Sequence, residues 1–468
     1  MSSTTVSHMT GEIQLHFLMN TRRYFLKTGA ALAAGFGGLQ LLTNTAGARA
    51  VKGYGALRAD PKKILDLPKG FSYRAFSKAG TRMADGLQVP GGADGMAAFP
   101  GENGLTVLVR NHELNPAITG SGGAFGESNK KLTDKIRAKM YDAGGRHKGK
   151  QVPPSLGGTT TVVYDTKRGH TVREFLSLAG TVRNCAGGPT PWNSWITCEE
   201  TADRAGGTLM RDHGYNFEVP ATTQPSLAHA VALKAMGRFR HEAVAVDPKT
   251  GIVYQTEDLG DSAIYRFIPK TPGTLAAGGR LQALVVRDSF ALDTRNWKEQ
   301  FVRVGAKHFT TWVDLDEVES PKNNLRLQAQ AKGAAKFARG EGMWWADRSV
   351  YFACTSGGKK QHGQIWKYTP ATGTLELYAE PNDPSVIDRA DNLTVAPWGD
   401  LVLCEDGPGE QFLSGITPKG GFYKIARNAV SNSEFAGATF SPDGTTLFVN
   451  IQRQGLTLAI IGPWRKTG

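Results

Sequence analysis

The stretch ATFSPDGTTLFVN at residues 438–450 consists of an apolar segment, a Pro-Asp-Gly turn and a second apolar segment. Two apolar segments joined by a short turn of this kind are typical of paired antiparallel β-strands. The stretches AVAVDPKTGIVYQT at 243–256 and LTVAPWGDLVLC at 393–404 follow the same scheme. Together they predict a strand-turn-strand unit that recurs along the chain.

Three further stretches complete the repeat. MWWADRSVYFAC at 343–354 and MAAFPGENGLTVLV at 96–109 have the same form, and a less regular turn at 190–193 precedes a strand at 194–198. The 57 glycines and 23 prolines among 468 residues also favour turn-rich β-structure over helical bundles. We expect an all-β fold, a six-bladed β-propeller with insertions between blades, of which the polar stretch 121–150 is one. A pair of β-sandwiches is the alternative.

The first fifty residues have the features of an export signal. Arg22 and Arg23 precede a mildly apolar stretch at 28–42 and an Ala-Arg-Ala sequence at 48–50. This order is typical of a twin-arginine signal with a signal-peptidase site, and the apolar run is shorter than the roughly 18 residues of a membrane span. We predict a cleaved signal at 1–50, with Met19 as an alternative start, and a single propeller domain at 51–468. The expected location is periplasmic or secreted, with the twin-arginine export machinery as a partner and no stable membrane anchor.

Charge and cysteine content narrow the function classes. Lys and Arg outnumber Asp and Glu by 55 to 42, and this excess steers anionic ligands toward the protein. No basic run is interleaved with aromatic residues, so nucleic acid is not expected as the main partner. The four cysteines form no C-x-x-C pair, so a zinc ribbon or redox motif is not predicted, while disulfides remain open.

A metal-competent residue lies immediately before the first strand of each unit. These residues are Asp94, Cys185, Glu242, Glu341, Asp391 and, more loosely, Glu434. A second acidic residue follows the second strand in four units, at Glu113, Glu200, Asp258 and Asp406. Because the inner strand of every propeller blade lines the channel, equivalent strand ends converge on one mouth of it.

Such a convergence has an electrostatic consequence. Crowded carboxylates raise one another's pKa unless cations neutralise them, so the pattern predicts bound metal. Oxygen-rich surroundings suit calcium, and a thiolate among carboxylates favours a transition metal such as iron. The alternative for any single acidic position is an ordinary solvated loop residue. We expect Cys198, Cys354 and Cys404 to pack as small apolar residues in the core.

The sequence NCAGGPTPW at 184–192, followed by CEE at 198–200, resembles the signature of the PhoX family of alkaline phosphatases. Further matches are NHE at 111–113, FRHE at 239–242 and FSPDG at 440–444, and the resemblance extends from about residue 94 to residue 452. At 339–343 the chain reads Arg-Gly-Glu-Gly-Met, where the well-studied members have Arg-Pro-Glu-Trp. Its substrate range therefore does not follow from the resemblance.

The resemblance implies a six-bladed propeller with two irons and several calcium ions at the channel mouth, acting on small phosphorylated substrates as a phosphate monoesterase. It implies Cys185 as a thiolate bridging the irons, and Arg339 as the residue that holds the phosphate. The implied carboxylate ligands of iron are Glu200, Glu242 and Glu341. The candidates for calcium are Asp94, Glu113, Asp391, Asp406 and Glu434.

Two other functions fit a propeller with an acidic channel mouth. A calcium-dependent lactonase or esterase would need carboxylates around one calcium and would tolerate replacement of Cys185. A non-catalytic propeller that binds metal or a partner protein would keep the acidic residues without turnover, and substitution of Arg339 would then change no activity.

Overall fold

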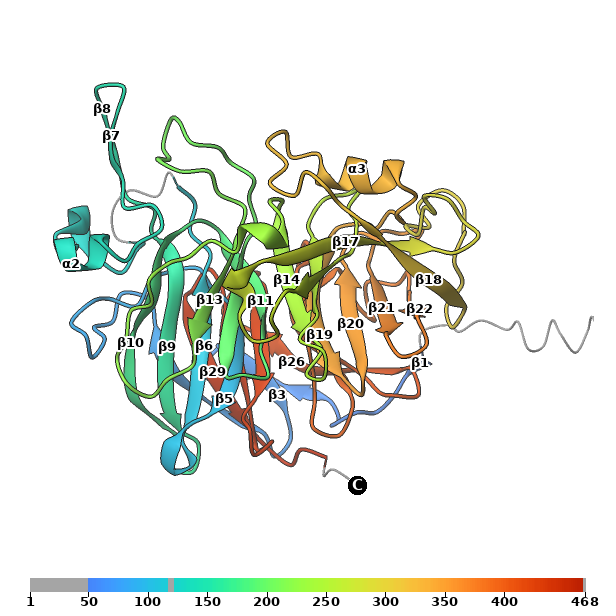
Figure 1. Ribbon diagram of the computed structural model, residues 1–468. Helices are drawn as coiled ribbons and strands as arrows, with labels where there is room; N and C mark the ends of the chain where they lie inside the picture. Colours follow the sequence, from blue (N-terminus) through green and yellow to red (C-terminus); the bar gives the residue numbers. More distant parts are fainter. Residues whose placement is uncertain (1–48, 117–121, 466–468) are drawn as a thin grey trace, which may run out of the picture. The chain divides into compact units, whose positions relative to one another are not determined.

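The structure is a computed structural model that describes residues 49–116 and 122–465 (Figure 1). Arg22, Arg23 and Met19 lie outside the described residues, so the signal at 1–50 stays a prediction. Within the described part, no helix is long and apolar enough to cross a membrane. Strands dominate this part of the chain, which confirms the all-β fold class.

The strands form four large antiparallel sheets and one smaller sheet, apart from a short hairpin. A four-stranded sheet has the order β10 (His170–Thr181), β9 (Gly157–Asp165), β6 (Thr106–His112), β5 (Ala93–Pro100). A three-stranded sheet has the order β11 (Asn184–Pro189), β12 (Ser194–Glu199), β13 (Asn216–Pro220). Another four-stranded sheet has the order β27 (Phe435–Phe440), β28 (Thr446–Ile451), β29 (Leu456–Ile461), β4 (Ser72–Lys78).

The two largest sheets contain seven and nine strands. The first has the order β2 (Leu57–Arg58), β3 (Leu65–Pro68), β26 (Gly421–Asn428), β25 (Phe412–Ile416), β24 (Leu401–Glu405), β23 (Ala390–Val395), with β1 (Arg49–Ala50) parallel to β26. The second has the order β14 (His241–Val246), β15 (Val253–Glu257), β16 (Tyr265–Pro269), β17 (Gly279–Val286), β18 (Lys307–Asp314), β22 (Thr374–Ala379), β21 (Gln364–Thr369), β20 (Ser349–Cys354), β19 (Gly340–Ala346).

All six sequence units form the antiparallel pairs that their pattern predicts. The stretch 438–450 forms β27 and β28, and the less regular stretch at 190–198 forms the turn and second strand of the pair β11 and β12. The first strands of the six pairs, β5, β11, β14, β19, β23 and β27, contact one another in a closed ring, which we call the inner strands. The count of six blades stays a prediction, because β18 joins two of the units into one nine-stranded sheet.

The ends of the described chain are held together by a sheet. β4, near the N-terminal end, pairs with β29, near the C-terminal end, from Ser72↔Ile461 to Lys78↔Leu456. A strand near one end of the described chain thereby extends a sheet built near the other end, and it covers the edge of β29. Apolar side chains from neighbouring sheets fill the space between them, and Cys198, Cys354 and Cys404 are fully buried there as expected. All four cysteines are free thiols.

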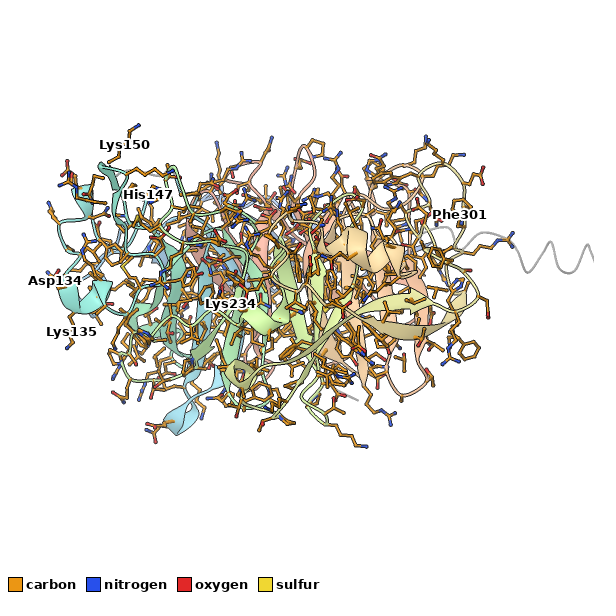
Figure 2. All side chains as sticks on the ribbon, turned by 45° about the horizontal axis from the view of Figure 1, so that its top comes forward. Asp134, Lys135, His147, Lys150, Lys234 and Phe301 are labelled. Carbon is orange, nitrogen blue, oxygen red and sulfur yellow. The ribbon has the colours of Figure 1, made fainter. Side chains whose placement is uncertain are left out.

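The predicted polar insertion lies between β6 and β9. It contains the short helix α2 (Asp134–Arg137) and a hairpin of β7 (Gly145–His147) and β8 (Lys150–Val152), which project from one side of the molecule (Figure 1). Asp134, Lys135, His147 and Lys150 point outward from this insertion (Figure 2). A second helix, α3 (Leu325–Ala331), follows β18. Both lie outside the ring of inner strands.

Candidate metal centre

Each inner strand begins with a β-bulge, and the bulge fixes which side chain enters the centre of the ring. In β14, for example, the pairing shifts between His241↔Glu257 and Val244↔Gln255. A bulge leaves an extra residue on one strand and redirects its side chain. Five predicted residues share this place, because each is the second residue of its inner strand: Asp94, Cys185, Glu242, Glu341 and Asp391.

These five residues, with two that follow the second strands, form three overlapping groups of ligand atoms. The groups are Asp94, Glu113 and Cys185; Cys185, Glu200 and Glu242; and Glu242, Glu341 and Asp391. Within each group the atoms lie within 4.8 Å of one another. Cys185 and Glu242 each belong to two groups, so they link the three into one continuous cluster. A carboxylate-rich set with one thiol fits both calcium and a transition metal.

Glu242 provides the strongest sign that this cluster is built for cations. Its side chain is 1% exposed, and neither carboxylate oxygen has a hydrogen-bond partner among the described residues. Buried carboxylate oxygens without a donor are costly, since nothing replaces the water they have lost. Metal ions held between the neighbouring ligand groups would supply that compensation, so the residues present fit a metal centre.

The pKa values of the cluster show how unfavourable it is without cations. Burial, with the nearby charge of Asp94, raises the pKa of the Cys185 thiol well above its usual range. Burial and neighbouring carboxylates raise the pKa of Asp391 to about 7, and burial with Asp258 raises that of Glu200 to about 7. The pKa of Glu242 is also raised well above normal, first by burial and then by Asp391. Bound cations would reverse these shifts.

The residues that follow the second strands are held by one recurring backbone contact. The N–H of Glu113 donates to the carbonyl of Gly92 at 2.8 Å, and that of Glu200 donates to the carbonyl of Arg183 at 2.9 Å. The same contact places Asp258 and Asp406 at the rim, as their sequence offsets predict. In the unit of β19 and β20 this position is Thr355, so the row of carboxylates is interrupted there.

Glu434 does not share the register expected for it. It precedes β27, and the bulge of that strand, between Ala436↔Asn450 and Thr439↔Phe448, gives the equivalent place to Gly437. Gly437 has φ +63°, and a β-carbon there would lie 2.4 Å from the carbonyl oxygen of Asp94, so a larger residue is excluded. Burial and the charges of Asp391 and Asp406 raise the pKa of Glu434, so it still lies near the cluster.

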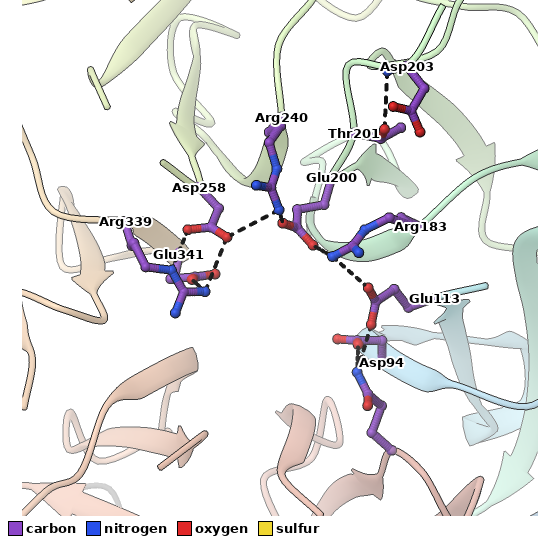
Figure 3. Close-up of polar contacts among 11 residues, drawn as sticks. Asp94, Glu113, Arg183, Glu200, Thr201, Asp203, Arg240, Asp258, Arg339 and Glu341 are labelled. Carbon is purple, nitrogen blue, oxygen red and sulfur yellow. Dashed lines mark hydrogen bonds and ion pairs between the residues drawn. The ribbon is translucent and has the colours of Figure 1, made fainter. Parts of the chain in front are cut away.

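Arginine side chains contact several acidic residues of the channel mouth (Figure 3). Arg339 forms a fork with Asp258, Nε to Oδ1 at 2.7 Å and Nη2 to Oδ2 at 3.1 Å, and Nη2 also donates to Glu341 at 2.6 Å. Arg183 and Arg240 both donate to Glu200. Across the ring, Gln452 donates to Asp94 at 2.8 Å and to Glu113 at 2.9 Å.

Most of these arginines escaped the sequence analysis, which selected only Arg339. A signal was present, since Arg183, Arg240 and Arg389 each stand two residues before a cluster residue, as Arg339 stands before Glu341. Equivalent positions of repeated propeller units lie at one level of the fold. The repeated arginine could therefore have predicted a second set of polar side chains at the same channel mouth.

Comparisons with known proteins bear on this centre. The family model described as Alkaline phosphatase PhoX matches residues 52–455. The structure of Pseudomonas fluorescens PhoX in complex with vanadate, a transition state analogue, is 18% identical with a TM-score of 0.62, covering 89% of this chain and 98% of that chain. A gluconolactonase of Xanthomonas campestris is 13% identical with a TM-score of 0.40, covering 85% of this chain and 97% of that chain. Among curated proteins, no match was found.

Proposed function

Since this chain belongs to the PhoX alkaline phosphatase family and is a metal-dependent phosphatase of phosphate monoesters, we propose that the cluster around Glu242 holds its metal ions. The observation that carries this assignment is the pair of buried Glu242 oxygens without a donor, lying between two groups of ligand atoms. No other buried carboxylate in the described residues has both of its oxygens in this state. A cation is the partner that this carboxylate lacks.

We further propose that the metals are two irons and several calcium ions. Cys185 would supply a thiolate shared by the irons, because it belongs to two ligand groups at once. Glu200, Glu242 and Glu341 would complete the iron ligands. Asp94, Glu113, Asp391, Asp406 and Glu434 would hold calcium, because carboxylate oxygens are the hard ligands that calcium prefers. Thiolate coordination also requires a deprotonated sulfur, which the raised pKa of Cys185 permits only beside a cation.

The metals would supply Lewis-acid contacts to the phosphoryl oxygens and lower the pKa of the attacking water. The protein's own contribution is positioning and charge. Asp258 holds the Arg339 guanidinium in a fixed plane through two hydrogen bonds. Nη1 of Arg339 makes no hydrogen bond with the described residues, so it can donate to an equatorial phosphoryl oxygen. A fixed guanidinium at that place stabilises charge that builds up in the transition state.

We propose export by the twin-arginine route as the setting for this activity. That pathway carries folded proteins, so a chain whose carboxylates need metal to tolerate burial could acquire it before export. Arg22 and Arg23 would form the recognition motif. The mature enzyme would then meet small phosphorylated substrates in the periplasm or outside the cell.

Elemental analysis of the purified mature protein, paired with p-nitrophenyl phosphate hydrolysis before and after chelation, tests this proposal. We expect iron near two per chain, calcium in addition, and loss of activity on chelation that calcium partly restores. Activity that is retained in metal-free protein would overturn the metal assignment. A fully metal-loaded protein without turnover would indicate a binding protein.

A further inference from the structure

Four arginines occupy the same place in four of the six units. Arg183, Arg240, Arg339 and Arg389 each lie two residues before a member of the cluster. The carbonyl of each accepts the N–H of the residue after the second strand, at 2.9 to 3.1 Å. These contacts hold the four arginines at one level around the channel mouth. We call them the rim arginines.

The backbone at this level does not favour arginine. Arg183, Arg339 and Arg389 have φ values of +48°, +55° and +55°, in the left-handed region. Gly92 occupies the equivalent place in its unit with φ +56°, and glycine adopts this conformation without steric cost. For a long side chain it costs about 1 kcal/mol or more, and such strain persists mainly where the side chain has a function.

The rim arginines differ in how they are paired. Arg183, Arg240 and Arg339 form ion pairs with Glu200, Asp258 or Glu341 of the cluster. Arg389 is half-buried, and it forms no ion pair within residues 49–116 and 122–465. The exposed Arg453 has none there either.

Arg389 and Arg453 nevertheless lie beside the centre. Arg453 directly follows Gln452, whose side chain donates to Asp94 and Glu113, so the backbone of Arg453 lies beside the centre. The carbonyl of Arg389 also accepts the N–H of Asp406 at 3.0 Å. Arg339, the proposed phosphate-holding residue, and Arg389 precede neighbouring inner strands, β19 and β23, so the two arginines stand side by side at the mouth.

We propose that Arg389, assisted by Arg453, binds a second phosphate group of the substrate while Arg339 holds the phosphate that is cleaved. This inference rests on the proposed function and names its substrate class: phosphate monoesters that carry another phosphate. Guanidinium groups bind phosphate through forked, charge-assisted hydrogen bonds. Once metals neutralise the carboxylates, the rim arginines leave the mouth positive, which favours such polyanions over singly phosphorylated esters.

The test compares adenosine 3′,5′-bisphosphate with adenosine 5′-monophosphate and p-nitrophenyl phosphate on the metal-loaded enzyme. Substitution R389Q should lower kcat/KM for the bisphosphate about tenfold more than for either monophosphate, through KM, since a charged hydrogen bond is lost. R389K should recover part of the difference, and R389Q/R453Q should enlarge it. The control is R168Q, because Arg168 is 79% exposed on the turn between β9 and β10, at the strand ends away from the cluster.

A binding measurement separates recognition from turnover. Titration calorimetry with inositol hexakissulfate, which offers no phosphoryl group, should give a Kd about tenfold weaker for R389Q than for wild type or R168Q. If wild type hydrolyses all three esters and R389Q changes them equally, or if the Kd is unchanged, the inference is overturned while the phosphatase assignment stands. If wild type with full metal hydrolyses none of them, the proposed function itself fails.

Discussion

Cys185 and Glu242 occupy the same place on neighbouring inner strands: each is the second residue of its strand, at a β-bulge, and their ligand atoms lie within 4.8 Å of each other. They stand 57 residues apart in the sequence, as 242 − 185 shows. The repeat of the fold, rather than a local motif, therefore brings sulfur and carboxylate together. Metal binding between Cys185 and Glu242 predicts measurable effects of substitutions on metal content, activity and stability.

Replacement of Glu242 by glutamine should remove metal from the protein. The amide keeps the volume but loses the charge of a carboxylate that belongs to two ligand groups. Substitution of residues that only support metal ligands typically costs about ten- to a hundredfold in metal affinity or activity. For the loss of a ligand itself we expect kcat/KM to fall by at least about a hundredfold. Elemental analysis should show fewer metal ions per chain. The matched control is E405Q, whose buried carboxylate pairs with Lys424 and belongs to none of the three ligand groups; equal metal loss in both variants would contradict the assignment.

Replacement of Cys185 by serine should affect iron more than calcium, because the softer thiolate is the ligand that favours a transition metal. We expect the iron content to fall by at least half with calcium largely retained, together with loss of any visible sulfur-to-iron absorption band. C354S serves as the control, since Cys354 is fully buried in the core. An iron content in C185S equal to that of wild type would show that the thiol is not a ligand.

Metal removal should make stability depend on pH in a defined direction. In the metal-free protein, burial raises the pKa of Asp391 from 3.8 to about 7 and that of Glu200 from 4.5 to about 7. The folded state then binds more protons at these two groups than the unfolded state, so their contribution to stability is fully present below their ordinary pKa values of 3.8 and 4.5 and is lost as pH rises through about 7. Urea unfolding of chelated protein should therefore show a lower free energy of unfolding at pH 8 than at pH 5. Added calcium and iron should abolish the difference, and a flat profile for the chelated protein would contradict this account.

A buried histidine should give a second loss of stability, in the same direction but at alkaline pH. His213 has no exposed side chain and contacts Glu199 at 2.6 Å and Asp142 at 3.4 Å. Burial alone would lower the pKa of His213, but these two carboxylates raise it to about 9. The resulting stabilisation, roughly 3 kcal/mol, is fully present below pH 6.5 and is lost as pH rises through 9. The metal-loaded H213Q variant should lose stability at pH 7 but little at pH 10.5, and an equal loss at both would exclude the charged pair.

Replacement of Arg339 by lysine should reduce turnover although the charge is retained. Lysine cannot form the fork with Asp258 and still present a fixed donor to a phosphoryl oxygen. Loss of one preorganised donor costs about a hundredfold in kcat, so we expect a decrease of that order with p-nitrophenyl phosphate. R427K is the comparison, because Arg427 also donates through Nε and Nη2 to one carboxylate, the Oδ2 atom of Asp66, on the outer strands. Unchanged kcat in R339K would remove Arg339 from the reaction.

The sequence predicts most of the fold because each unit contains both of its strands and its own turn. The five cluster residues at the bulges follow from this local repeat, and so do Glu113, Glu200 and Asp406. The register predicted for Glu434 was wrong, because β27 and β28 form one more residue pair before the bulge than the other units do. The additional pair is Phe435↔Ile451, which precedes Ala436↔Asn450. Spacing alone does not show such an extension.

Other features depend on contacts between distant segments, which no local pattern records. β18 pairs with both β17 and β22, so it joins two units that the sequence separates. The pairing of β4 with β29 connects strands near opposite ends of the chain. The sequence also does not show that both Glu242 oxygens lack a hydrogen-bond donor. This depends on which groups of the described chain the neighbouring inner strands bring close to them.

Anomalous diffraction at the iron absorption edge, on crystals of the mature protein, tests the metal centre most directly. A peak within bonding distance of both Cys185 Sγ and the Glu242 carboxylate is the result that the account predicts. Crystals of iron-containing, active protein with no peak at this junction, or with the peak at another place in the molecule, would contradict it.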